Sequence, residues 1–418
     1  MNAVLNRPQA ARQLVDAAFL ADPYPTYRAL REAGPIHWSD EFFGGAWLLT
    51  RHADVEAVLR DPRFSAQRTG GWVNHAASER GDLAGFQQLF ARALLFLDAP
   101  DHTRLRTLMQ PAFRPEALAR LRPVIEDMAD ELLAELDGEA EFDFIDRVAR
   151  RLPVRVISTI LGIGHADRAE VVAWSDDLAT FIGAPEPTSA QARRAQASLL
   201  AMTRYFQEQL LAKRQAPDDS LLSRLLQARE QGEVRDDAEL LAQCAMLLFA
   251  GHETTRNLLG NGLQALLSHP DQWQLLQREP QRMPVAVREL LRYDSPVQYT
   301  GRRVTTDLMF HGQLLRRGDL VLPLIGAANR DPARHAEPER LDVTRSDPGA
   351  LSFGSGIHVC LGAALTRLEA EVVFGRLLER GVDWQLANRE AQWCMNPAYR
   401  GLATLRLRSP AAQAAGRR

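Results

Sequence analysis

A glycine-rich segment near the C-terminal end constrains this chain more than any other feature. Residues 353–362 read Phe-Gly-Ser-Gly-Ile-His-Val-Cys-Leu-Gly, and a helical pattern follows from Ala363 to Leu378. The glycines permit backbone angles that other residues resist, and they keep side chains away from the sulfur of Cys360. Free N–H groups and the dipole at a helix N-terminus stabilise a thiolate. These properties suit an axial ligand for heme iron; the alternative is an ordinary loop cysteine before a helix.

The segment resembles the heme-binding signature of the cytochrome P-450 family. In that signature Phe, two glycines, a basic residue, the cysteine and a following glycine recur at these spacings. The resemblance implies that Cys360 ligates the iron of heme b (iron protoporphyrin IX), with Phe353, His358 and Gly362 beside the cofactor. Further landmarks occur in family order from about Ala99 to Glu369, so the resemblance covers almost the whole chain.

Helical patterns dominate the rest of the sequence, and the longest is a mostly apolar stretch from Asp237 to Ser268. Short strand patterns occur at residues 36–38 and 46–50, and residues 301–323 alternate like a hairpin. We therefore predict a mainly α fold with a minor β portion. The resemblance narrows this to the cytochrome P-450 fold, with the long helix over the heme. We expect a single domain over residues 1–418, with frayed ends at about 1–10 and 411–418.

Composition excludes several classes of protein. The 418 residues are 46% hydrophobic and 25% charged with a net charge of −3, which is ordinary for a globular protein and does not indicate nucleic-acid binding. Three cysteines argue against a disulfide framework and for a reducing compartment. No secretion signal and no apolar run of the ~20 residues needed for a membrane span is found. We expect a cytoplasmic protein without a membrane span.

The long helix carries an acid followed by an alcohol at its middle. Residues 250–255 read Ala-Gly-His-Glu-Thr-Thr, and Gly251 removes a side chain where something flat could lie close. The segment resembles the oxygen-activating helix of the family. The resemblance implies that Glu253 and Thr254 relay protons during catalysis, with Ala250 and Gly251 against the cofactor. The alternative is a surface helix face with a chance Glu-Thr pair.

A second helix presents two basic groups four residues apart, His102 and Arg106. Two such groups on one helical face can hold an anion, although a solvated basic helix is the alternative. The segment is similar to the family's helix that binds the heme propionates. The resemblance gives the same role to His358 and Arg302, and the adjacent Arg303 leaves that last assignment open by one residue.

Glu289 and Arg292 lie three residues apart on one helix face, where an exposed pair would contribute only a few tenths of a kcal/mol. The pair resembles the family's Glu-x-x-Arg motif. The resemblance implies a buried, structural charge network that Arg340 completes. His335 stands where the family often has Phe, so we expect altered packing at that position.

Taken together, these resemblances imply a heme-thiolate monooxygenase of the kind found in secondary metabolism. The resemblance implies insertion of one oxygen atom from O2 into a largely apolar small molecule, by hydroxylation or epoxidation. Because the chain has no flavin or iron–sulfur motif, electrons should come from a separate ferredoxin and its reductase, and NAD(P)H acts only indirectly. The alternatives are a peroxide-driven heme-thiolate enzyme and a non-catalytic heme-binding sensor.

Family positions also suggest a substrate pocket and a docking face for the redox partner. The possible pocket residues are Met246, Ala250, Val297, Gln298, Tyr299 and Met395. The possible docking residues are Arg104 and Arg367, which would place positive charge near the thiolate. Arg367 could instead pair with Glu371, four residues further along the helix.

Overall fold

The computed structural model describes residues 14–67, 89–164, 168–185, 187–346, 349–388 and 390–410. The expected frayed ends lie outside the described residues. The sequence also predicts an irregular, polar loop over residues 64–94. The structure describes residues 64–67 and 89–94 of it, and the others lie outside the described residues.

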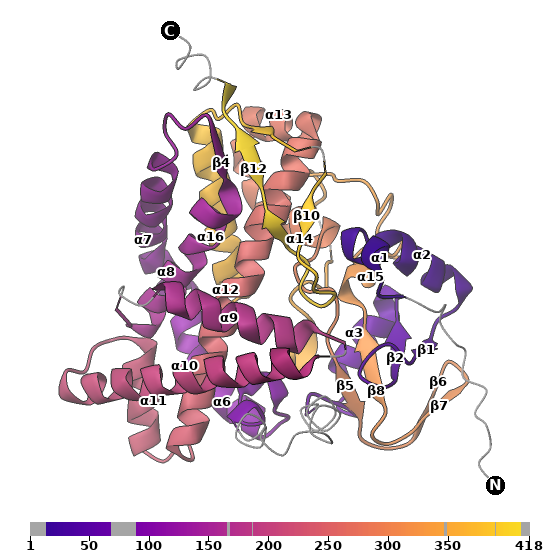
Figure 1. Cartoon of the computed structure of the whole chain (residues 1–418). Coiled ribbons are helices and arrows are strands. Elements are labelled where there is room, and N and C mark those ends of the chain that lie inside the picture. The colour runs from indigo at the N-terminus through magenta and orange to yellow at the C-terminus, as the bar shows by residue number, and fades with distance from the viewer. Residues whose placement is uncertain are drawn as a thin grey trace.

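Helix α12 (Asp237–Ser268) runs through the middle of the helical part (Figure 1). Its N-cap Asp236 accepts a hydrogen bond from the N–H of Glu239, and acidic residues in the first turn complement the helix dipole. Side chains are buried on nearly every face of this helix, which is typical of a helix packed on all sides. The helix that carries the predicted acid and alcohol is therefore the centre of the fold.

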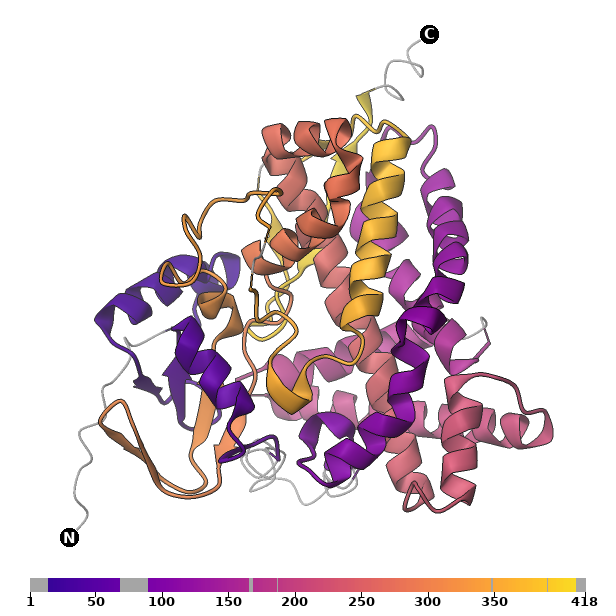
Figure 2. The same cartoon turned by 180° about the vertical axis from the view of Figure 1, so that it is seen from behind.

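Neighbouring helices surround α12. It packs against α8 (Arg151–Leu161), α9 (Arg168–Gly183), α10 (Ser189–Gln215) and α16 (Ala363–Glu379). Seen from behind, α16 lies beside α7 (Pro115–Ala134) (Figure 2). In the described part of the chain the other helices are α1 (Ala17–Ala21), α2 (Tyr24–Ala33), α3 (His52–Arg60), α6 (Asp101–Met109), α11 (Leu221–Glu230), α13 (Pro270–Arg278), α14 (Met283–Tyr293) and α15 (Ile325–Ala328). Single turns of 3-10 or π helix lie at Leu94–Phe96, Gln110–Phe113, Ile145–Ala149, Pro280–Arg282 and Gly356–His358.

The β portion is small, as the sequence predicted. One sheet of five strands lies to the side of the helices (Figure 1), in the order β1 (His37–Ser39), β2 (Ala46–Leu49), β8 (Leu320–Pro323), β5 (Arg302–Val304) and β3 (Phe64–Ser65). Strands β2 and β8 pair in parallel, with Leu48 opposite Leu322. The remaining strands are β4 (Glu141–Asp143), β12 (Arg406–Arg408) and β9 (Gln385–Leu386) in one sheet, and the pairs β6 (Leu308–Phe310) with β7 (Gln313–Leu315) and β10 (Gln392–Trp393) with β11 (Leu402–Thr404).

The loop before α16 holds Cys360 in a tight turn. The N–H of Cys360 donates to the carbonyl of Phe353 at 2.8 Å. Gly354 and Gly356 both have φ of +75°, a conformation that glycine adopts readily. A Cβ on Gly356 would also lie 3.0 Å from the carbonyl oxygen of Leu59. Two of the glycines are thus required by backbone angles, and one of them by close packing on α3.

A buried charge network lies around Glu289 and Arg292. The prediction that the side chain of Arg340 completes it was wrong. Glu289 and Arg292 are fully buried and lie 2.7 Å apart. The third arginine is Arg345, whose Nε lies 3.2 Å from Glu289. The side chain of Arg340 is 60% exposed and approaches Glu337 instead.

Backbone groups explain the exchange of arginines. Arg292 donates to the carbonyls of Asn329, Pro338 and Arg340, so position 340 contributes its main chain while its side chain points outward. The N–H of Asp342 donates to Glu289 at 3.0 Å, and the turn that follows brings Arg345 inward. A single buried charge pair would be costly, and these extra hydrogen bonds offset the cost.

His335 predicts a measurable acid sensitivity. The side chain is buried against His52, and desolvation, together with Arg292 and His52, lowers its pKa to about 3. The unfolded chain therefore binds this proton first, so stability falls as pH drops below about 6.5 toward 3. The contribution lost between pH 7 and pH 5 is about 2 kcal/mol. We expect His335→Phe to reduce the loss of unfolding free energy over that interval by this amount.

Urea unfolding followed by far-UV circular dichroism at both pH values measures the difference. His269→Phe is the control, because His269 is only half-buried. An identical pH dependence in wild type and His335→Phe would show that His335 does not carry this acid sensitivity.

Candidate active site

A cavity of about 1470 Å³, open solvent included, lies between α6, α12 and the Cys360 loop. Every side chain or glycine that the sequence analysis assigned to the cofactor lies on its wall: His102, Arg106, Ala250, Gly251, Arg302, Phe353, His358, Cys360 and Gly362. These residues come from four separate parts of the chain. The fold brings them together at one site.

Cys360 lines this cavity and is exposed to it. Desolvation raises the pKa of its thiol, while the N–H of Gly362 and the guanidinium of Arg106 act in the opposite direction. The groups that stabilise a thiolate are therefore in place beside the sulfur. A soft metal bound to the sulfur would complete the deprotonation.

The cationic wall of the cavity is built from α6, β5 and the Cys360 loop. The rings of His102 and His358 lie 4.1 Å apart. Desolvation lowers the pKa of Arg106, and Cys360 opposes that effect. Arg302 lines the cavity, whereas Arg303 donates to the carbonyl of Gly318 outside it. Of the two arginines, Arg302 is therefore the one that can meet a ligand in the cavity.

Helix α12 forms another wall. Ala250, Gly251 and Thr254 line the cavity, and the hydroxyl of Thr254 donates to the carbonyl of Ala250 at 3.3 Å. This hydrogen bond within the helix is common for Thr and leaves the oxygen able to accept another. A Cβ on Gly251 would lie 2.9 Å from Ile157. Packing of α8 against α12 therefore requires the glycine, in addition to its place beside the cavity.

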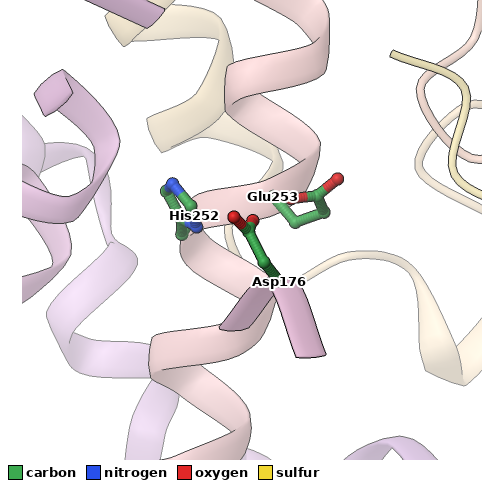
Figure 3. Close-up of side chains that lie close together, drawn as sticks. All are labelled: Asp176, His252 and Glu253. Carbon is green, nitrogen blue, oxygen red and sulfur yellow. The ribbon is translucent and has the colours of Figure 1, made fainter. Parts of the chain in front are cut away.

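Glu253 lies behind this wall and does not line the cavity. It is buried, and its Oε1 accepts from Arg256 at 3.0 Å and from Asn257 at 3.2 Å. Figure 3 shows it beside His252 on α12, with Asp176 approaching from α9. Desolvation raises the pKa of Glu253, Arg256 lowers it and Asp176 raises it further. The pKa of this carboxyl group is thus set by opposing effects of burial and neighbouring charges.

Half of the expected substrate residues line the cavity. Met246, Ala250 and Val297 do so, and Thr300, Leu94, Leu95 and Leu247 join them. The prediction was wrong for Gln298, Tyr299 and Met395, which do not line the cavity. Gln298 donates to the carbonyl of Ser295, and Tyr299 donates to the carbonyl of Gly183. Met395 is 72% exposed at the surface.

The two arginines expected on the docking face, Arg104 and Arg367, have different surroundings. Arg104 lies 2.6 Å from the buried Glu239 on α12 and donates to the carbonyl of Glu233. Its charge is therefore neutralised within the protein, and the expectation that it contributes positive charge near the thiolate was wrong. Arg367 donates to the carbonyl of Ala363 at 3.2 Å and lies over the ring of Phe353. Within the described part of the chain it forms no ion pair with Glu371, which lies 3.6 Å from Arg122.

Comparison with known proteins decides the family. A family model described as Cytochrome P450 matches residues 154–392, more than half of the chain. The chain belongs to the cytochrome P450 family. Its relatives are named monooxygenases and hydroxylases, and the protein is accordingly a cytochrome P450 monooxygenase with heme iron as its cofactor.

Related proteins from bacteria match over nearly the whole length of this P450. Cytochrome P450 107B1 of Saccharopolyspora erythraea is 40% identical, with 94% of this chain and 96% of that protein aligned. Vitamin D(3) 25-hydroxylase of Pseudonocardia autotrophica is also 40% identical, with 90% of each chain aligned. The solved structure of P450BioI, in complex with hexadec-9Z-enoic acid ligated acyl carrier protein, is 32% identical with a TM-score of 0.87, covering 94% of this chain and all of that one.

The residues around the cavity fit heme. One wall presents the sulfur of Cys360, and another presents Arg106, which forms no ion pair with an acidic side chain in the described residues. The buried Nδ1 of His102 has no hydrogen-bond partner within the same residues. Such donors suit the two carboxylates of heme.

No helix in the described segments is both long and apolar enough to cross a membrane.

Sequence reasoning missed Arg345 and the apolar wall from Leu94, Leu95 and Leu247. The apolar residues carry no motif, because a hydrophobic wall of a cavity has the same composition as a core. Leu247 lies next to Met246 on α12, so its helical position was the only available signal.

Proposed function

We propose that this P450 inserts one oxygen atom of O2 into a largely apolar small molecule, by hydroxylation or epoxidation, with electrons from a ferredoxin and its reductase. The observation that carries the proposal is the single cavity that joins Cys360, the cationic wall and Thr254 to apolar side chains. NAD(P)H supplies the reductase and does not bind this chain. We also propose a cytoplasmic location, which the sequence indicates.

Each group of residues has a distinct task. When bound, heme supplies an iron that activates dioxygen, with electron donation from a thiolate sulfur. Cys360 would hold that iron, and His102, Arg106, Arg302 and His358 would hold the propionate carboxylates. Thr254 presents a hydroxyl at the cavity wall and holds a proton there. Behind it, Glu253 takes up protons from solvent and releases them toward the hydroxyl.

An apolar substrate is supported by the wall that faces it. The residues are leucines, Met246 and Val297, with the hydroxyls of Thr254 and Thr300 as polar contacts. Gln243 also reaches the wall, but its amide oxygen accepts from the N–H of Leu94 and its nitrogen donates to the carbonyl of Arg92. The vitamin D(3) and hexadec-9Z-enoic acid named for two relatives are likewise mostly hydrocarbon.

The alternative is a peroxide-driven enzyme, which does not need a proton relay. Thr254 at the cavity wall and the pKa-shifted Glu253 behind it favour the oxygen-dependent reaction. The test first screens small molecules for a low- to high-spin shift of the heme spectrum. Compounds that shift the spectrum are then incubated with ferredoxin, reductase and NADPH under ¹⁸O2, and in parallel with hydrogen peroxide alone. Product labelled with ¹⁸O supports the proposal, whereas turnover that occurs with hydrogen peroxide but not with ferredoxin, reductase and NADPH overturns it.

We further propose that the ferredoxin docks on the face behind Cys360, where Arg367 extends from the first turns of α16. Arg367→Glu should slow reduction by the ferredoxin and weaken its salt dependence, because charge-steered encounter is screened over ~8 Å at physiological ionic strength. Substrate affinity should not change. Stopped-flow reduction under carbon monoxide, across a salt series, measures both effects.

Arg380→Glu is the matched control, since it makes the same charge change at the far end of α16, where Arg380 pairs with Asp137. Equal reduction rates in wild type and Arg367→Glu would exclude this docking face.

A further inference from the structure

Arg256 on α12 is shared between carboxylates from two helices. Its Nη2 lies 3.0 Å from Oε1 of Glu253 on the same helix, and its Nη1 lies 3.2 Å from Oδ1 of Asp176 on α9. The guanidinium is almost completely buried. Figure 3 shows Asp176 reaching α12 between His252 and Glu253. One buried cation therefore has two acidic partners, only one of which belongs to the proposed proton relay.

Other groups complete the surroundings of Glu253. Arg150 lies 3.9 Å from Asp176, and Arg256 also donates to the sulfur of Cys394 at 3.7 Å. His252 is fully buried, and desolvation together with the two arginines lowers its pKa to about 3, so it is neutral. Asp176, His252 and Glu253 offer atoms within 4.8 Å of one another. Arg256 and Arg150 place two positive charges beside these groups, which disfavours a divalent cation.

We infer that Asp176 is a positioning residue for Glu253, which keeps that carboxyl able to exchange protons by holding part of the hydrogen bonding of Arg256. The inference rests on the role of Glu253 proposed above. If Asp176 were neutral, Arg256 would belong to Glu253 alone, and a buried, fully paired carboxylate is strongly stabilised in its charged form. Glu253 would then stay ionised and would release protons poorly.

The second oxygen of Glu253 supports this inference. Its Oε2 is buried and has no hydrogen-bond partner within the described part of the chain. A charged oxygen without a partner is costly in that position, whereas a protonated carboxyl is tolerated. The pKa of Glu253 responds as this inference requires, since desolvation and Asp176 raise it and Arg256 lowers it.

Asp176→Asn tests the inference, with Asp177→Asn as the matched control. Asp177 is the next residue on α9 but binds Ser198 and approaches Arg194, away from Arg256. The carboxyl band of Glu253 is identified in difference infrared spectra by its loss in Glu253→Gln, and is followed across pH. We expect the band to titrate at lower pH in Asp176→Asn and to be unchanged in Asp177→Asn. Asp176→Glu should restore the wild-type titration.

Turnover provides a second readout on the substrate-bound holoenzyme. Oxygen consumption by Asp176→Asn should fall about tenfold at neutral pH and recover on acidification, as protons return to Glu253. An unchanged Glu253 titration in Asp176→Asn, or the same shift in Asp177→Asn, would overturn the inference. Failure of the proposed function is seen separately, as normal oxygen consumption in Glu253→Gln, and leaves the infrared titration as the test of Asp176.

Discussion

Cys360→His should lose the red-shifted Soret band that reduced, carbon monoxide-bound heme-thiolate proteins show, and should lose monooxygenase activity, while the protein can retain heme through the imidazole. The reason is that the band reports sulfur donation to the iron. Absorption spectra of the purified variant under carbon monoxide are the measurement.

Cys244→Ala and Cys394→Ala are the controls, since these are the other two cysteines and neither lines the cavity. Both should keep the band. A thiolate-type spectrum in Cys360→His would transfer the ligand role to one of them and would remove the basis for the site described above.

Thr254→Ala should still bind heme, substrate and carbon monoxide, but should consume NAD(P)H with release of hydrogen peroxide instead of product. A positioned proton donor contributes ~10²–10⁴ in rate, so product formed per NAD(P)H consumed should fall steeply. Both quantities are measured in the same reconstituted reaction.

Thr255→Val is the comparison, because the hydroxyl of Thr255 lies 3.2 Å from that of Thr366, and Thr255 does not line the cavity. It should remain coupled. Normal coupling in Thr254→Ala would remove this hydroxyl from proton delivery.

The cofactor side of the cavity was predicted from the resemblance to the family, whose motifs are short segments of sequence. Backbone angles open to glycine, the start of a helix and the spacing of His102 and Arg106 are all properties of short segments. The long helix was predicted with its observed bounds, Asp237–Ser268, because an apolar run of that length has a clear N-cap and no internal break.

The errors arose where side-chain direction depends on distant parts of the chain. Arg340 meets Arg292 through its backbone carbonyl and not through its side chain. Tyr299 turns toward the end of α9. Arg104 is held by Glu239, far along the chain, and no local pattern shows that this acid lies within reach.

The parallel pairing of β2 with β8 sets an order of events during synthesis. Leu48 emerges early from the ribosome, but its partner Leu322 follows only after the whole of α12 has been made. At roughly 5–20 residues per second, the N-terminal strand waits on the order of tens of seconds for its neighbour. Pairing between such distant segments is also slow to form. The early strand is therefore exposed without its partner during that interval, and Cys360, made later still, can meet heme only when the wait is over.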